Sequence, residues 1–169
     1  MALKKTSSTL VISVQATETA ANTFTQAAVD LALDPLNNEV FVVQAINVDA
    51  QEPDSVAGST TRTGASVSTT SRTTLGSLAD TNVMAVARES IVMNAGSVDG
   101  VSFSRTAAET FQAEGLEYIG IIATNDFFVQ IEGANNTAAK TAAAKIYGFR
   151  AKMDSSGYAA LVKSELLSQ

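Results

Sequence analysis

Asp49, Glu52 and Asp54 place three carboxylates within six residues, and carboxylate oxygens are the ligands that calcium prefers. Calcium takes about 6–8 oxygen ligands, however, and the sequence lacks the spacing of acidic residues and glycine that defines an EF-hand. Pro53 also interrupts the run. We therefore expect a solvated acidic loop here rather than a metal site, and the sequence indicates no cofactor.

Two pairs of neighbouring charges, Arg88 with Glu89 and Arg105 with Glu109, are further candidates for catalytic chemistry. The chain contains no His and no Cys, so a Ser-His-Asp or Cys-His site is impossible within it. An isolated carboxylate pair for glycoside hydrolysis stays open, although there is no Trp and there are only three Tyr to build a sugar-stacking groove. Near charges on strands are far more often solvated faces or subunit contacts, so we expect no enzyme and no catalytic residue.

Charge and motifs argue against nucleotide or nucleic-acid chemistry. The net charge is −6, and Lys4 and Lys5 stand alone rather than in a basic arm, so we expect no direct contact with nucleic acid. Phosphate-binding glycine motifs and the zinc-protease motif are absent. Residues 135–137 (Asn-Asn-Thr) form a glycosylation sequon, but without a secretory signal we interpret this segment as a turn.

Composition predicts one ordered domain. The chain has 169 residues, of which 46% are hydrophobic and 17% are charged. The apolar run at 10–14 is interrupted by Ser13 and is too short for a signal peptide, and no stretch approaches the length of a membrane span. We expect a chain that is made in a cytoplasm.

The segment from 116 to 153 organises the prediction because it contains three strands in succession, at 116–122, 126–132 and 144–153. The middle strand alternates strictly. Its two faces carry Phe127, Val129 and Ile131 on one side and Phe128, Gln130 and Glu132 on the other. If the first set lies in the core, Phe128 must face outward, unless a bulge turns both phenylalanines inward.

The whole chain is predicted to contain eight strands without helices between them, which excludes a parallel sheet with crossovers. They are expected near 23–33, 39–49, 67–75, 83–93, 98–111, 116–122, 126–132 and 144–153. The strand at 39–49 starts with residues that are apolar on both faces, which indicates a doubly covered position. The Thr-rich segment 67–75 has a mobile Ser/Thr loop as its alternative, and residues 50–66 are expected to be a loop.

We therefore predict an all-β fold, an eight-stranded antiparallel jelly-roll β-sandwich, with an up-and-down lipocalin-like barrel as the alternative. Residues 1–21 form an N-terminal arm, 22–153 the jelly-roll domain and 154–169 a short C-terminal helix capped by Asp154 or Ser155.

The arm and one strand supply the predicted subunit interface. Leu10, Ile12 and Val14 share one side of the arm, which we expect to pair along a sheet edge in its own subunit or in a neighbour's. Phe128 is the fourth predicted interface residue, because exposed aromatic residues are enriched in subunit contacts.

The order of elements resembles the single jelly-roll capsid proteins of tailless icosahedral viruses. The segments that carry the resemblance are DPLNNEVFVVQAINVD at 34–49, DFFVQIEGANN at 126–136 and KIYGFRAKM at 145–153, followed by the short helix. It implies a virion shell subunit without catalytic residues. Many small RNA-virus capsid proteins have an Arg-rich packaging arm, which this chain lacks. The resemblance therefore fits a shell that lies over a membrane or over other virion proteins.

The function predicted first is a structural one, a capsid subunit that self-assembles in a virion and has copies of itself as its main partner. The alternative is a β-sandwich binding module or adhesin that recognises a glycan or a receptor. Fold alone does not separate the two, since jelly rolls host unrelated functions.

Overall fold

The computed structural model describes residues 3–93, 101–106, 109–111 and 114–167. The chain is almost entirely β, with one α-helix at its C-terminal end. The elements are β1 (Leu3–Lys5), β2 (Leu10–Thr17), β3 (Thr25–Asp30), the 3-10 turn η1 (Pro35–Asn37), β4 (Glu39–Ala50), β5 (Thr61–Ser68), β6 (Val83–Met93), β7 (Val101–Thr106), β8 (Glu109–Phe111), β9 (Gly120–Ile122), β10 (Asp126–Ala134), β11 (Thr141–Met153) and α1 (Ser155–Leu167).

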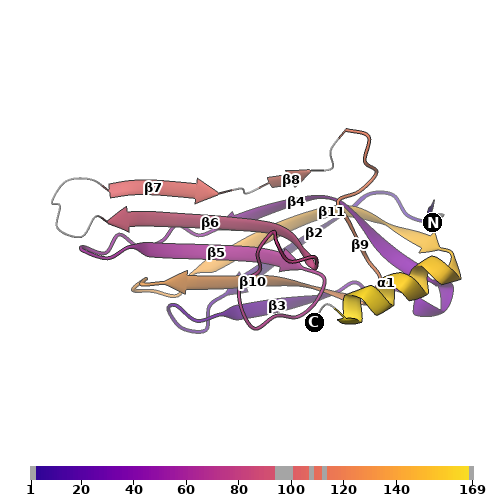
Figure 1. Cartoon of the computed structure of the whole chain (residues 1–169), viewed down its shortest axis with the longest axis horizontal. Coiled ribbons are helices and arrows are strands. Elements are labelled where there is room, and N and C mark those ends of the chain that lie inside the picture. The colour runs from indigo at the N-terminus through magenta and orange to yellow at the C-terminus, as the bar shows by residue number, and fades with distance from the viewer. Residues whose placement is uncertain (1–2, 94–100, 107–108, 112–113, 168–169) are drawn as a thin grey trace.

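The strands form two antiparallel sheets that pack face to face (Figure 1). In sheet A, β1 and β2 both pair with β11, β11 pairs with β4, and β4 pairs with β8 and β9. In sheet B the order is β3-β10-β5-β6-β7. The predicted two-sheet antiparallel sandwich with a C-terminal helix is confirmed, and the two open sheets exclude the closed barrel.

The strand order is that of a jelly roll. Strands β2, β11, β4 and β8/β9 lie side by side in one sheet, and β3, β10, β5 and β6 lie side by side in the other. The chain therefore crosses repeatedly from one sheet to the other, and the last two strands insert between earlier ones, as in two interleaved Greek keys. Strands β1 and β7 extend the edges of this arrangement.

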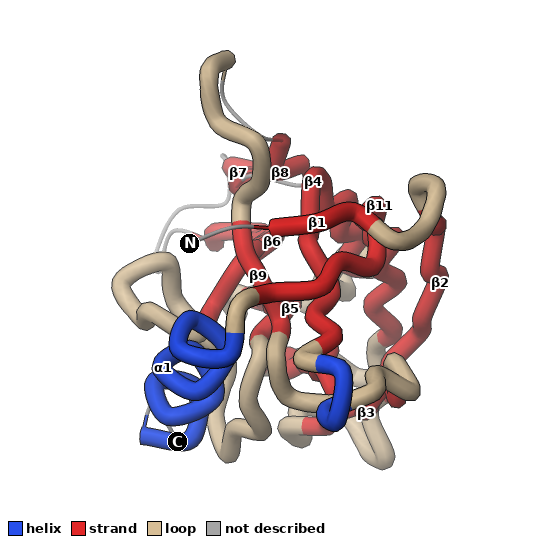
Figure 2. Tube along the Cα trace, turned by 90° about the vertical axis from the view of Figure 1, so that its right-hand side faces the viewer, coloured by secondary structure: helices blue, strands red, loops and turns tan. Residues whose placement is uncertain are grey.

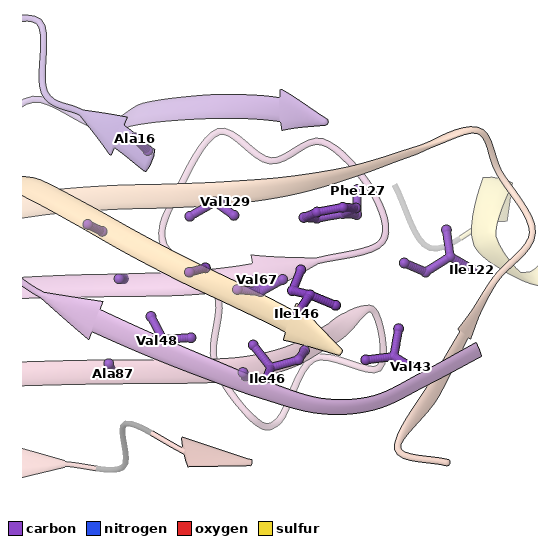
Figure 3. Close-up of a cluster of buried hydrophobic side chains, with 14 of the residues drawn as sticks. Ala16, Val43, Ile46, Val48, Val67, Ala87, Ile122, Phe127, Val129 and Ile146 are labelled. Carbon is purple, nitrogen blue, oxygen red and sulfur yellow. The ribbon is translucent and has the colours of Figure 1, made fainter. Parts of the chain in front are cut away.

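The main core lies between the two sheets (Figure 3). Phe127 and Val129 of β10 face Ile46 of β4 and Ile146 of β11, and each is fully buried. Burial of such a side chain stabilises the fold by about 1.5–3 kcal/mol. The alternation predicted for β10 is therefore confirmed on its core face.

A bulge in β4 lets this strand serve both faces of sheet A. Tyr147 pairs with Ala45 while Gly148 pairs with Val43, so Gln44 is the extra residue. A Cβ on Gly148 would collide with the Phe41 ring and with the backbone of Val42. The predicted double cover of this strand is confirmed, since its N-terminal half buries side chains on both sides.

Helix α1 covers part of the outer face of sheet A (Figure 2). Tyr158, Leu161 and Val162 pack against Val40 and Val42 of β4. The helix begins as predicted, because the Asp154 carboxylate accepts hydrogen bonds from Ser156 Oγ and Gly157 N. None of the helices in the described ranges is both long and apolar enough to cross a membrane.

The outer face of sheet B is covered by the loop at 69–82, which we call the β5–β6 loop. Gly76 N donates to Ser66 Oγ at 3.0 Å and Arg72 N donates to Gln26 Oε1 at 2.9 Å. The prediction of a strand at 67–75 was therefore wrong, since β5 ends at Ser68 and the following Ser/Thr residues fold back over the sheet.

Three further boundaries differ from the prediction. Six of the eight residues of β5 lie in the segment expected to be a loop at 50–66. The single strand expected at 98–111 is two strands, β7 and β8, which belong to different sheets, and parts of that range lie outside the described residues. The strand expected at 116–122 is limited to β9, because residues 114–119 form a loop.

Candidate interaction surfaces

The predicted interface residues of the arm lie on β2, which pairs with β11 of the same chain. Ile12 and Val14 pack against the main core, because the residues opposite them, Ile146 and Ala144, face the interior. Leu10 continues the same side of the strand and is 37% exposed. The structure therefore places the strand in its own sheet, and contact of these residues with a neighbouring copy stays a prediction.

Phe128 lies on the outer side of β10, between Ala28 of β3 and Ser68 of β5, and is half-buried. No bulge interrupts the pairing here, so the alternation holds at Phe127 and Phe128. Gln130, which shares the face of Phe128 as predicted, is wholly buried because the β5–β6 loop covers it. A role for Phe128 in subunit contact stays a prediction.

The half of the outer face of sheet A that α1 leaves open carries an apolar row. Val11, Tyr147, Ala45 and Phe111 are direct neighbours across β2, β11, β4 and β8. Val11 is 54% exposed and Phe111 is 61% exposed. Sequence reasoning missed the row, because it appears only when the register of four strands is known.

Beside this row, the same face contains an open groove of about 600 Å³. Its lining combines hydroxyl, amide and charged side chains with one aromatic ring, and includes Ser13, Gln15, Asn47, Asp49, Arg105, Lys145 and Tyr147. Clefts of a few hundred cubic ångströms with a few placed polar groups are typical of small-molecule sites. The groove is therefore the place where a ligand would be sought.

Arg105 joins the two sheets at the edge of this groove. Its Nε donates to Glu89 Oε1 at 3.1 Å, and its Nη2 lies 3.8 Å from Asp49 Oδ1. Glu89 faces the interior, where burial raises the pKa of its carboxyl. Within the described residues, its Oε2 and the hydroxyl of Thr63, opposite it on β5, have no hydrogen-bond partner.

The sequence-based interpretation of Glu89 as part of a solvated face was therefore wrong. Arg88, its neighbour, is exposed and donates to Gly76 O of the β5–β6 loop at 3.3 Å. Glu89 and Arg105 instead form a structural ion pair between adjacent strands. The side chain of Glu109, the fourth residue of these pairs, lies outside the described residues.

A network of buried polar groups closes one end of the sandwich. Lys140 Nζ pairs with Asp54 Oδ1, and the ammonium group is the largest cause that holds the pKa of Asp54 far below its usual range. The Glu18 carboxylate accepts hydrogen bonds from Gly133 N at 2.6 Å and from Lys140 N at 2.8 Å. Asn136 connects the loop after β4 to strand β5, because its Oδ1 accepts a hydrogen bond from Asp54 N and its Nδ2 donates one to Arg62 O.

This network explains what the acidic cluster of the sequence does. Asp54 is occupied by Lys140 and Thr137, whereas Asp49 and Glu52 are exposed. Among the residues that the structure describes, no three His, Cys, Asp or Glu side chains are placed to hold a metal ion. Asn135 of the sequon sits in a left-handed turn with φ 59°, as its interpretation as a turn predicts.

No protein-family model and no curated protein matches the sequence. Among solved structures, the chain is similar to a chain of Desmodium yellow mottle tymovirus, with 13% identity, a TM-score of 0.29, and coverage of 88% of this chain and 91% of that one. It is also similar to a chain in a structure of infectious bursal disease virus Gt strain, with 11% identity and a TM-score of 0.15, over 97% of this chain and 47% of that one. Both TM-scores are below the level at which a structural match supports a fold assignment. The assignment of the jelly roll rests on the strand order described above.

Proposed function

We propose that this chain is a structural shell subunit, which associates with copies of itself in a virion. The observation that carries the proposal is the strand order, because two interleaved Greek keys in this order form the jelly roll that virus capsid subunits use. Lectins and cupins share this architecture, so the fold supports the function only by analogy. The features of the protein surface are needed to choose among these functions.

The interior supports a structural role. The space between the sheets is filled by Phe41, Phe127 and the aliphatic residues around them, which are fully buried. A jelly roll that holds a ligand between its sheets needs a cavity at this place. Any contact with a ligand or a partner is therefore expected on the outer surface of the sandwich.

The outer surface supports self-association at one flank of the sandwich. Val92, Phe103, Phe111 and Leu116 are between 41% and 61% exposed, and all lie on or beside strands β6 to β9. Among the strands that the structure describes, β7 pairs with β6 alone, so its other side offers backbone groups to a neighbour. Exposed edges and aromatic residues are what a neighbouring copy would bury.

The partners that follow from this proposal are copies of the chain and other virion proteins, with an underlying membrane as a further neighbour. Direct binding of nucleic acid is not part of it, because the net charge is −6.

A second candidate function is recognition of a glycan or receptor, and the groove on sheet A is the observation that favours it. Tyr147 offers a ring for stacking, and Asn47 and Gln15 offer amide groups that can bond hydroxyls. In a glycan-binding protein these side chains would carry affinity, and self-association would not be required.

Sedimentation of the full-length protein, followed by negative-stain microscopy, separates the two functions. A shell subunit is expected to form pentamers, hexamers or larger closed particles. A protein that stays monomeric at high concentration, and whose Tyr147→Ala variant loses binding to a glycan panel, would support recognition and overturn the shell.

A further inference from the structure

Three exposed lysines lie at one edge of sheet A, and we call them the lysine edge: Lys4 and Lys5 of β1 and Lys152 of β11. Lys4 stands directly opposite Lys152 in the antiparallel pairing. Strands β1, β2 and β11 contain no acidic residue at all. The edge is therefore basic in a chain whose net charge is −6.

Within the described part of the chain no ion pair includes any of the three lysines. Glu39 of β4 stands opposite Lys152 in the register, but its carboxylate is paired with Arg150 at 3.0 Å. Lys152 Nζ donates to the amide oxygen of Asn37 at 3.2 Å, and Lys5 Nζ lies 4.5 Å from the centre of the Phe149 ring. Asp34 is close enough for Lys152 to act on it, but its carboxylate is already bonded to Leu36 N and Asn37 Nδ2. Like charges directly opposite each other destabilise a strand pair, so an external anion would stabilise this edge.

The opposite edge of the same sheet carries the complementary charge. Residues 114–117 (Glu-Gly-Leu-Glu), which we call the acidic loop, precede β9, and Figure 2 shows this segment standing clear of the two sheets. Both glutamates are exposed, and Leu116 between them is 58% exposed. Gly115 has a φ of +86° and lies at the turn, where a residue with a Cβ would be strained.

The two features lie at opposite ends of one row of strands, β1-β11-β4-β9. A neighbouring copy placed edge to edge would therefore bring its acidic loop to the lysine edge of the first. Such a contact is heterologous, because it joins two different surfaces, and repeated contacts of this kind form a ring when the rotation between copies closes. It needs no partner other than a second copy of the chain.

Resting on the shell function proposed above, we infer that the acidic loop of one copy docks on the lysine edge of the next copy. Glu114 and Glu117 pair with Lys4, Lys5 and Lys152, and Leu116 packs on the apolar surface beside them. That surface is present, because Val11 is 54% exposed on the outer side of β2 and the half-buried ring of Phe149 lies under Lys5.

A second copy explains more of the surface than an anionic membrane or a nucleic acid does. Phosphates would satisfy the lysines, but they would leave an apolar Leu116 exposed between two carboxylates. The chain itself supplies both charge signs at the two edges of one sheet. Electrostatic complementarity of this kind sets the register of a contact and speeds its formation.

Charge reversal with rescue tests the contact in the full-length protein. One variant carries Lys4→Glu and Lys5→Glu, and the other carries Glu114→Lys and Glu117→Lys. Each is expected to raise the concentration needed for assembly by about tenfold or more, which corresponds to roughly 1.4 kcal/mol. Combining all four substitutions in one chain is expected to restore assembly, because opposite charges face each other again. Mixing the two variants should do the same in rings with an even number of copies, where the variants can alternate.

Matched controls reverse exposed charges elsewhere, with Lys163→Glu on α1 and Glu52→Lys in the loop after β4. Both controls should assemble like the unmodified protein, and thermal melts should show every variant folded, since all altered side chains are exposed. Salt at about 1 M, where the Debye length is about 3 Å, should weaken assembly of the unmodified chain more than that of either reversed variant.

The outcomes are distinguishable. Assembly of both reversed variants at the unmodified concentration, or impaired assembly that neither mixing nor combination rescues, would overturn the docking inference and leave the shell function standing. The same holds if the lysine edge binds vesicles of anionic lipid or an oligonucleotide while reversal leaves assembly unchanged. If the unmodified chain itself never assembles, the shell function fails first.

Discussion

The two outer faces of the sandwich are covered by different kinds of interaction, apolar packing on one and hydrogen bonding on the other. Over sheet A, helix α1 buries Val40, Val42 and Met153 beneath Leu161 and its neighbours. Over sheet B, the β5–β6 loop covers a layer of serine and glutamine side chains. The first cover works through apolar area, which has no preferred direction, and the second through hydrogen bonds, which require exact partners.

The polar cover is organised around Gln130. Its amide accepts a hydrogen bond from Ser66 Oγ at 2.8 Å and donates to Ser68 Oγ at 2.7 Å and Gln26 Oε1 at 3.2 Å. The loop is itself held by Arg72, which forms an ion pair with Asp80 at 2.9 Å. Networks of this kind are strong when complete and costly when one member is removed.

Because of this difference, substitutions that change the side-chain volume by the same amount should lower the free energy of unfolding differently on the two faces. An apolar cover tolerates exchange for another apolar residue of similar volume. A polar cover does not, because each orphaned group loses its hydrogen bond to water without a replacement. The following predictions test this contrast, from the largest effect to the smallest.

The largest loss in the free energy of unfolding is expected for substitutions in the core between the sheets. Phe127→Ala is expected to lower the free energy of unfolding by about 3–5 kcal/mol, because it empties a fully buried site. Phe128→Ala, one residue further along, should cost about 1 kcal/mol or less, since that ring is half-buried on the outer face. Urea unfolding of both variants measures the difference, and equal losses would show that the faces are not separate.

Removal of the central amide is expected to have the next largest effect. Gln130→Leu keeps the volume but should cost about 2–4 kcal/mol, because the hydroxyls of Ser66 and Ser68 lose a buried partner. Gln15→Leu, at an exposed position of β2, is the matched control and should stay within about 0.5 kcal/mol. If Gln130→Leu lowered the free energy of unfolding as little as the control does, the hydrogen bonds of the polar layer would not be needed for stability.

The apolar cover should respond to volume alone. Leu161→Ala is expected to lower the free energy of unfolding by about 1–2 kcal/mol, since this side chain is only partly buried against sheet A. Leu161→Met should cost less than about 1 kcal/mol. Leu166→Ala, whose side chain is 56% exposed, is the control on the same helix. If Leu161→Met proved as damaging as Leu161→Ala, the helix cover would depend on shape as strictly as the loop does.

The smallest expected effect is a dependence on pH that belongs to the helix cover. Burial is the main cause that raises the pKa of Glu165 above its usual value of 4.5, although Ala123 N and Thr124 N donate to its carboxylate. The folded chain therefore binds this proton more tightly than the unfolded chain, and stability falls as pH rises from about 4.5 through the raised pKa.

Glu165→Gln should remove this dependence. The difference in melting temperature between the unmodified chain and the variant should change across the same pH interval, and a constant difference would contradict the prediction. Glu89 also has a pKa raised by burial, so it contributes a slope of the same sign to both proteins and cancels in the comparison.

The sequence predicted what local patterning controls. The alternation from Phe127 to Ile131, the doubly apolar start of β4 and the N-cap at Asp154 are all properties of a few neighbouring residues, and all are confirmed. The jelly-roll order and the C-terminal helix followed from the number and spacing of such elements.

What the sequence could not predict depends on residues far apart. Gln130 is buried because a loop some sixty residues earlier returns over it, and Ser66 bonds it across 64 residues of sequence. Glu89 and Glu165 look like surface charges until the structure supplies Arg105 and the backbone of Ala123 as partners. The β5 strand was missed because the Ser/Thr residues that follow it have the same composition as a strand with a wet face.

The pairing of β2 with β11 has a consequence for how the chain folds. Strand β2 finds its partner only when residues 141–148 have been made, and Glu18 and Lys140, which close the adjacent loops, are 122 residues apart. Contacts this distant in sequence slow folding, because the chain entropy is lost before the contacts form. Until those residues are made, Ile12 and Val14 lack the strand beside which they pack. We therefore expect the N-terminal strand to be the segment most exposed to aggregation and to chaperones during biosynthesis.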